Sequence, residues 1–153
     1  MKEENLIYVN FRNLDEIREI DKTVSDLMAK YKVVDQRNVY VDSYLNDAKP
    51  SLEQLMFDAK VLAMEDKQPR IICQRLWDLF PEHTGKAAID KIDYCVESHI
   101  QIFDDFSKED VTSYKVTSEN KSGYSKIRLF LEELKILEES QVKQDSQVSK
   151  GGD

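Results

Sequence analysis

The feature that most constrains the fold of this chain is a long helical pattern over residues 84–106, TGKAAIDKIDYCVESHIQIFDDF. Its mostly apolar positions recur at steps of three and four, which places them on one face of an α-helix. These positions are Ala88, Ile92, Cys95, Val96, His99, Ile102, Phe103 and Phe106. The Thr84 hydroxyl can cap the N-terminus of this helix. Because the apolar face is wide enough to contact neighbours on two sides, we expect the central member of a helical bundle.

Glycine and proline divide the rest of the chain into elements. Outside the last residues, glycine occurs only at positions 85 and 123, and proline only at positions 50, 69 and 81. All of these lie between apolar-periodic stretches, which is typical of element boundaries. The pattern predicts helices over 14–31, from 51 to about 66, over 70–80 and over 124–142. Asn13 and Ser51 are the expected N-caps of the first two.

Two short segments, 5–11 and 38–45, are rich in β-branched and aromatic residues and predict two strands that pair with each other. The predicted fold class is therefore mainly α, a bundle of about five helices with a minor two-stranded β element near the N-terminus. The alternative is an α+β fold with a small helix-flanked sheet. We expect one helical domain over residues 1–142 and a disordered polar tail over 143–153.

Composition limits where the protein works and what it binds. The 22 basic and 30 acidic residues give a net charge of −8, which argues against nonspecific binding to nucleic acid or anionic membranes. No signal peptide and no membrane-spanning run are recognisable, so a cytoplasmic protein is expected. The acidic charge leaves three options open: a protein whose charge has no role in its function, a protein that binds basic protein surfaces, or a mimic of nucleic acid.

No residue set in the sequence carries a recognisable chemistry. Phosphate-binding loops need several glycines within one loop, and the glycines here are too few and too far apart. Cys95 and His99 are four residues apart, a usable spacing for zinc, with Cys73 as a third ligand but no fourth. The alternative is that these are buried thiols and a hydrogen-bonded core histidine. We therefore assign no catalytic, cofactor-binding or metal-binding residue, no cofactor, and expect no enzyme.

The last predicted helix offers a candidate partner-binding surface. Ile127, Phe130, Leu134 and Leu137 form one apolar seam, while Leu129 and Ile136 form a second apolar edge. One neighbouring helix cannot easily cover both edges, so the second edge is expected to meet another protein or a second copy of the chain. Arg128 could add specificity and Tyr124 an aromatic anchor. The candidate partner-binding residues are Tyr124, Arg128, Leu129 and Ile136.

Three functional hypotheses follow from the sequence. The first is a non-catalytic protein-binding module, such as an adaptor, small assembly subunit or assembly chaperone of a bacterial or phage system. The second is an acidic inhibitor or nucleic-acid mimic that acts on a host enzyme. The third is an enzyme with an unfamiliar site built on Cys95 and His99, which an exposed thiolate would support and a buried thiol would contradict. No direct nucleic-acid binding and no membrane binding are expected.

Overall fold

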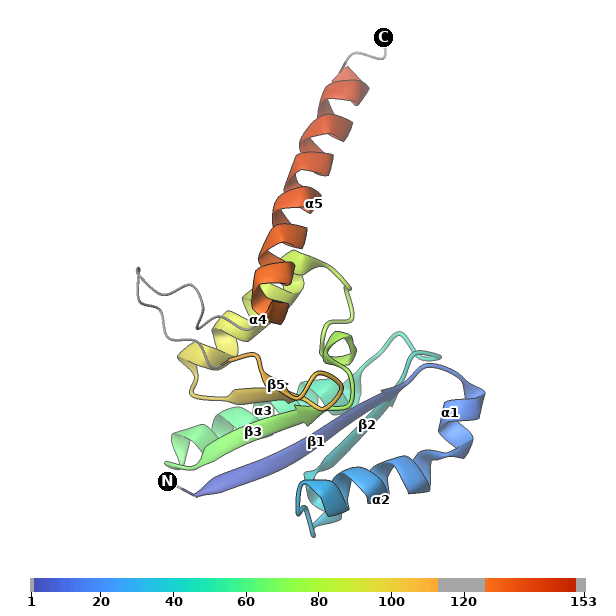
Figure 1. Ribbon diagram of the computed structural model, residues 1–153, viewed down its shortest axis with the longest axis vertical. Coiled ribbons are helices and arrows are strands. Elements are labelled where there is room, and N and C mark those ends of the chain that lie inside the picture. The colour runs from blue at the N-terminus through green and yellow to red at the C-terminus, as the bar shows by residue number, and fades with distance from the viewer. Residues whose placement is uncertain (1, 113–125, 151–153) are drawn as a thin grey trace.

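A computed structural model describes residues 2–112 and 126–150, with side chains up to residue 143. Its centre is a five-stranded sheet in the order β2-β1-β3-β4-β5. The first four strands in this order run parallel to one another, and β5 runs antiparallel to β4. Helices cover the sheet, and α5 extends away from the body toward the C-terminus (Figure 1).

The elements alternate along the chain between strands and helices. The strands are β1 (Glu3–Phe11), β2 (Val39–Ser43), β3 (Gln68–Cys73), β4 (Gln101–Asp104) and β5 (Glu109–Asp110). The α-helices are α1 (Leu14–Arg18), α2 (Ile20–Lys30), α3 (Pro50–Met64), α4 (Gly85–Glu97) and α5 (Lys126–Lys150). Two short 3-10 helices are η1 (Gln36–Asn38) and η2 (Leu76–Leu79).

The helices lie on both faces of the sheet, because side chains along each strand alternate between two cores. On one face, Ile7, Val9 and Phe11 of β1 pack with Leu27 of α2. On the other face, β1 contributes Leu6 and Tyr8 to a larger core that also contains buried side chains of α3, α4 and η2. The chain is thus a doubly wound α/β domain, in which crossover helices join parallel strands.

The prediction of a mainly α bundle with a minor β element is wrong. Segments 5–11 and 38–45 do pair, as β1 and β2, with Val9 opposite Val41. They belong, however, to a larger sheet whose central strands are buried on both faces. Such strands form continuous apolar runs without the alternation of a half-exposed strand, so periodicity alone does not separate them from short helices.

Two predicted helices contain strands instead. Within the helix expected over 70–80, residues 70–73 belong to β3 and residues 76–79 form η2. The pattern over 84–106 holds only as far as Glu97, where α4 ends and the chain turns into β4. His99 adopts a left-handed conformation with φ 61°, and the Ile100 amide donates to the Cys95 carbonyl at 2.8 Å. These bonds close the helix C-terminus and redirect the chain into the sheet.

The other helix boundaries differ less from expectation. The helical segment at 14–31 is divided at Glu19 into α1 and α2, and the predicted Asn13 cap is confirmed by a bond from the Glu16 amide at 2.9 Å. The α3 helix begins with Pro50 as its first residue, and its Leu52 amide donates to the Asp42 carboxylate of β2 at 2.9 Å. The helical backbone of α5 continues to Lys150. The division into domain 1–142 and tail 143–153 stays a prediction.

The α5 helix packs closely against α4. A Cβ atom added at Gly85 would lie 2.7 Å from the Lys135 amide nitrogen and 2.9 Å from the Leu131 carbonyl oxygen, both backbone atoms. Glycine is therefore required at this crossing because no larger residue leaves room for the α5 backbone. Within the described residues, no helix is both long and apolar enough to span a bilayer.

Candidate ligand-binding site at the carboxyl edge of the sheet

The candidate site lies where the parallel strands end. Strand β1 continues through α1 and α2 to β2 on one side, whereas β3 continues through α4 to β4 on the other side. In doubly wound sheets, ligands bind outside the carboxyl ends of adjacent strands whose connections diverge in this way. Two arginines follow the two strands at this point, Arg12 after β1 and Arg75 after β3.

One hollow of about 480 Å³ lies at this edge, lined by Arg12, Tyr44, Trp77 and His83. We call it the aromatic hollow. The rings of Tyr44 and His83 stack with centroids 5.6 Å apart, and Trp77 meets His83 edge-on at 6.0 Å. His83 has φ 51°, a strained conformation for a residue other than glycine. Within the described part of the chain, the Arg12 guanidinium forms no ion pair.

A fully buried carboxylate, that of Asp78, binds the Tyr44 side chain of the aromatic hollow. Asp78 accepts hydrogen bonds from the Tyr44 hydroxyl at 3.1 Å and from Arg75 Nε at 3.3 Å. The Tyr44 hydroxyl also lies 3.2 Å from His83 Nε2. Burial raises the pKa of Asp78, and burial together with the Asp78 charge raises the pKa of Tyr44 to about 12. Tyr44 is thus a protonated hydrogen-bond donor near neutral pH.

Arg75 connects Asp78 to α1. Its guanidinium donates to both Glu16 oxygens, at 2.9 and 3.1 Å, and to the Asn10 carbonyl at 2.9 Å. Glu16 also accepts the backbone amide of Arg12 at 2.8 Å. The hydrogen bonds from Arg75 lower the pKa of Glu16. A bidentate pair of this kind fixes both orientation and distance, so Glu16 and Arg75 tie the ends of β1 and β3 together.

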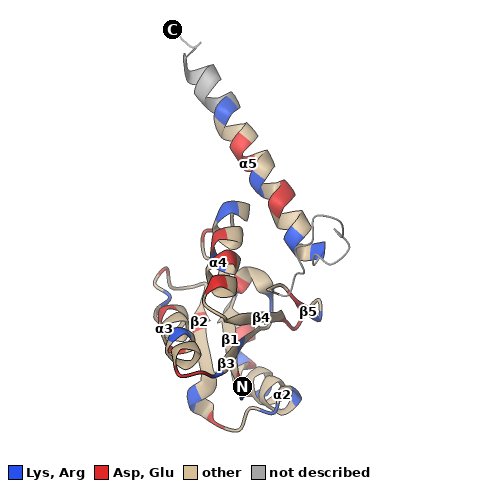
Figure 2. Cartoon of the chain, turned by 90° about the vertical axis from the view of Figure 1, so that its left-hand side faces the viewer, with Lys and Arg blue, Asp and Glu red and all other residues tan. Residues whose placement is uncertain are grey.

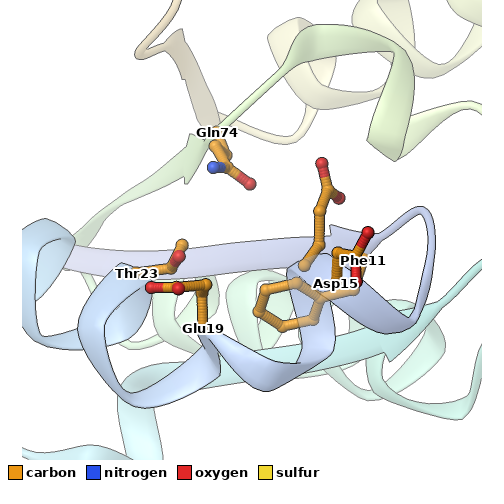
Figure 3. Close-up of a pocket in the computed structure, with 6 residues that line it drawn as sticks. Phe11, Asp15, Glu19, Thr23 and Gln74 are labelled. Carbon is orange, nitrogen blue, oxygen red and sulfur yellow. The ribbon is translucent and has the colours of Figure 1, made fainter.

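A second, smaller pocket of about 330 Å³ lies on the α1–α2 side of the same edge. It is lined by Phe11, Asp15, Glu16, Glu19, Thr23 and Gln74. Figure 3 shows Gln74 extending from the end of β3 toward Asp15 and Glu19 at the α1–α2 corner. We call it the acidic pocket. Glu16 therefore both lines this pocket and binds the groups that hold the aromatic hollow.

The described side chains of the carboxyl edge are suited to binding, and neither Cys73 nor Tyr44 is an activated nucleophile. Cys73, at the end of β3, is fully buried, and burial raises the pKa of its thiol far above neutrality. Tyr44 keeps its proton near neutral pH, as described above. In the described residues, no three or more His, Cys, Asp or Glu side chains come together in a geometry that could hold a metal ion.

The residues considered for a Cys–His site do not form one. Cys95 is fully buried in α4, and burial raises the pKa of its thiol to about 12. His99 is exposed and lies beyond the helix C-terminus. The hypothesis of an enzyme built on Cys95 and His99 is therefore wrong, because it needed an exposed thiolate.

The candidate partner-binding residues on the last helix have different surroundings. Leu129 and Ile136 are 40% and 61% exposed on α5. Arg128 is buried and forms an ion pair with Asp93 of α4 at 2.7 Å, so it joins two helices of the same chain. Tyr124 lies outside the described residues. The assignment of this surface to a partner stays a prediction.

None of the residues that line the aromatic hollow was assigned to a site from the sequence. The overlooked signal was positional. Arg12 and Arg75 follow the apolar runs LIYVNF and IIC closely. If both runs are parallel strands, the two arginines meet at one edge of the sheet. Assigning the second run to a helix removed that inference.

Comparisons with known proteins give a likeness in fold only. No family model matches the sequence, and no curated protein matches it either. Among solved structures, the chain is similar to a resolvase family site-specific recombinase from Streptococcus pneumoniae, with a TM-score of 0.59 and 11% sequence identity. The match covers 98% of this chain and 100% of that chain. The fold is therefore resolvase-like, and the match covers most of the chain.

This likeness overturns the favoured functional hypothesis. A non-catalytic adaptor, assembly subunit or assembly chaperone was inferred from the absence of recognisable chemistry and from the wide apolar last helix of an expected bundle, whereas the chain has a resolvase-like α/β fold. The inhibitor and nucleic-acid-mimic hypothesis was based on the net charge of −8 and the small size of the chain, and it gains no support from the comparison. Whether the chain catalyses a reaction is a separate question, which an 11% identical neighbour does not answer.

Proposed function

We propose that this chain is a resolvase-like domain that works on nucleic acid and binds one nucleotide unit in the aromatic hollow. The observation that carries the proposal is the placement of Arg12, which has no ion pair among the described residues, beside the rings of Tyr44, Trp77 and His83. Aromatic rings stack on bases of any sequence, and a guanidinium binds phosphate through paired hydrogen bonds. The structural neighbour is named as a site-specific recombinase, which supports nucleic acid as the ligand class.

The net charge decides how much nucleic acid such a site can hold. Binding a duplex along its phosphate backbone requires many lysine and arginine contacts, and a chain with a net charge of −8 is poorly suited to make them. A single nucleotide unit needs one cation and a stacking surface. In Figure 2, basic and acidic residues are interspersed along the elements of the body. We therefore propose a mononucleotide or an unpaired nucleotide of a strand as the ligand.

Trp77 makes this proposal directly testable, because it is the single tryptophan of the chain. Titration with thymidine 5′-monophosphate should change its fluorescence with saturation, and a short oligothymidylate should do the same. Arg12→Gln should weaken binding at least about tenfold, as expected for loss of a charge-assisted hydrogen bond. Arg18→Gln is the matched control, since Arg18 is exposed on α1 and pairs only with Asp15 among the described residues. The site would be contradicted if the titration did not saturate, or if both variants bound the nucleotide with equal affinity.

We also propose that the outer face of α5 pairs with a second copy of the chain. Leu129, Phe130, Ile136 and Leu137 are 40%, 58%, 61% and 66% exposed. They form two pairs seven residues apart, which places both pairs on one side of the helix, facing away from α4. An antiparallel crossing of two such helices would bring the first pair of one copy against the second pair of the other. Acidic and basic residues alternate along this helix (Figure 2), which limits repulsion between two acidic chains.

The native mass in solution tests this pairing. Light scattering at two concentrations should give a dimer for the natural chain and a monomer for the double variant Leu129→Glu with Ile136→Glu. The matched control is Lys126→Glu with Lys143→Glu, which adds acidic charge to the same helix at exposed positions without removing an apolar side chain. A monomeric natural chain at both concentrations would reject the pairing. So would an equal loss of the dimer in both double variants.

A further inference from the structure

Glu16 connects the two pockets of the carboxyl edge, and the proposed nucleotide site alone does not explain this position. Its side chain lines the acidic pocket on the α1–α2 side of the sheet, while its carboxylate oxygens bind groups that lead to the aromatic hollow on the η2 side. The first route is short. Glu16 Oε1 accepts the Arg12 backbone amide at 2.8 Å, and the Arg12 side chain lines the aromatic hollow.

The second route passes through the buried interior. Glu16 holds the Arg75 guanidinium by two bonds, and Arg75 Nε reaches Asp78 at 3.3 Å. Asp78 in turn accepts the Tyr44 hydroxyl, and Tyr44 stacks on His83, which Trp77 meets edge-on. Each link is a direct contact at a measured distance. The side chains involved are buried or half-buried except for His83, so their positions depend on one another.

We propose that Glu16 is a positioning residue for the nucleotide site, which fixes Arg12 directly and Tyr44 through Arg75 and Asp78. This inference rests on the proposed function for its ligand. The physical reason is that Asp78 is a fully buried carboxylate and Arg75 is its nearest cation. Without the Glu16 carboxylate, the guanidinium is free to turn fully toward Asp78 or toward solvent. Either movement changes the hydrogen bond that holds the Tyr44 ring.

The acidic pocket provides a matched pair of carboxylates for a test. Glu16→Gln keeps the side-chain shape and removes the charge that binds Arg75. Asp15→Asn changes a neighbouring carboxylate of the same pocket, whose only ion pair among the described residues is with the exposed Arg18. Arg75→Lys is the second variant, because a lysine cannot form the two-pronged bond and should reproduce the Glu16→Gln effect.

Two readouts separate positioning from general destabilisation. In the free protein, the emission maximum of Trp77 and its quenching by acrylamide should change in Glu16→Gln and Arg75→Lys and stay as in the natural chain in Asp15→Asn. The affinity for thymidine 5′-monophosphate should fall at least about fivefold in the first two variants, as for a lost charge-assisted bond whose effect reaches the ligand through neighbouring residues. Both readouts are taken well below the melting temperature of each variant.

The outcomes distinguish this inference from the proposed function. If the natural chain binds no nucleotide but Glu16→Gln still shifts the Trp77 emission, the coupling stands and the proposed ligand fails. If the natural chain binds nucleotide and Glu16→Gln leaves emission and affinity unchanged, the positioning role is overturned while the proposed function stands. An equal change in Asp15→Asn would also overturn it, because the effect would then belong to the charge of the pocket as a whole.

Discussion

The carboxyl edge of the sheet and the crossing of α4 with α5 are built in opposite ways. At the carboxyl edge, charged and aromatic side chains hold one another through hydrogen bonds and leave hollows between them. At the helix crossing, the α5 backbone lies directly on Gly85, and Leu131 is 1% exposed. Charged side chains also join the two helices, because Glu138 accepts the Gly85 amide at 2.9 Å and Arg128 pairs with Asp93 at 2.7 Å.

This difference separates residues that hold the fold from residues that present a site. Where the two helix backbones are in contact at Gly85, there is no room for a ligand, and a buried side chain removed from this contact leaves a cavity. The carboxyl edge keeps unoccupied volume beside fixed polar groups, which is typical of binding sites. Substitutions at the crossing should therefore change stability first, whereas most substitutions at the aromatic hollow should change ligand binding first.

The largest expected effect is at the crossing. Leu131→Ala should lower the free energy of unfolding by about 2–5 kcal/mol, because it removes a buried side chain from the main core. In the monomer, Leu137→Ala on the same helix should lower the free energy of unfolding by less than about 0.5 kcal/mol, since Leu137 is 66% exposed. Chemical denaturation of both variants measures the difference. Equal losses would mean that the outer face of α5 is packed as tightly as the inner face.

The second effect concerns Gly85 itself. Gly85→Ala should destabilise the protein by about 1–3 kcal/mol, because the added methyl group would overlap backbone atoms of α5 that cannot rotate away. Intrinsic helix propensity alone favours alanine over glycine within a helix by about 1 kcal/mol. The two effects therefore predict opposite signs for the change in stability, which thermal and chemical unfolding of the variant can both measure. A more stable Gly85→Ala variant would show that α5 does not approach α4 this closely.

The third effect is pH dependence at the carboxyl edge. Burial alone would raise the pKa of Asp105, but the bonds from Lys108, Lys30 and Tyr31 outweigh it and lower the pKa to about 2. The unfolded chain protonates this group near pH 4, so the stabilisation is present above that pH and is lost as pH falls toward 2. This difference corresponds to roughly 2 kcal/mol at neutral pH.

Asp105→Asn should therefore lower stability near pH 7 and reduce the decrease between pH 4 and 2. Unfolding curves at a series of pH values measure both. The control is Asp15→Asn, because the Asp15 side chain is 91% exposed and its pair with Arg18 should contribute little. If Asp105→Asn kept the same acid dependence as the natural chain, the cluster of Lys30, Tyr31 and Lys108 around it would not hold in solution.

The smallest effect returns to the crossing. Glu138 accepts the amides of Gly85 and Lys86 and so satisfies donors at the N-terminus of α4 from another helix. Glu138→Gln should cost about 1 kcal/mol, because it removes a negative charge from the positive end of the α4 dipole. Glu139→Gln is its control, an exposed glutamate one residue on. Equal stabilities of the two variants would show that the cap contributes nothing measurable.

Part of the fold could be predicted from the sequence, and the failures have a common cause. The helical segments at 14–31, after Pro50 and after 126 were found because amphipathic helices bury one stripe and expose another. Strand β4 and the end of α4 were missed because His99, a polar residue in a left-handed conformation, ends the helix where glycine is usually expected. Strand β3 was missed because its apolar residues 71–73 are all buried and show no alternation.

The candidate site was harder to predict than the fold. The residues that line the aromatic hollow, Arg12, Tyr44, Trp77 and His83, come from four separate segments. Their proximity can be inferred only when the strand order is known. Their spacing in the sequence carries no repeat or motif. Glu16 could be recognised as part of a helix cap, but its bonds to Arg75 depend on β1 and β3 being neighbours. Long-range topology, rather than local pattern, determines this site.

The most direct measurement of the central claim is a nuclear magnetic resonance titration with thymidine 5′-monophosphate, observed at aromatic ring and arginine Nε signals. Binding in the aromatic hollow should shift the signals of Arg12, Tyr44, Trp77 and His83 together with one saturation curve. The Arg37 signal is an internal reference, because this arginine pairs with Asp35 at the opposite, amino-terminal edge of β2. Shifts that are absent at the hollow, or equally large at Arg37, would contradict a nucleotide site at the carboxyl edge.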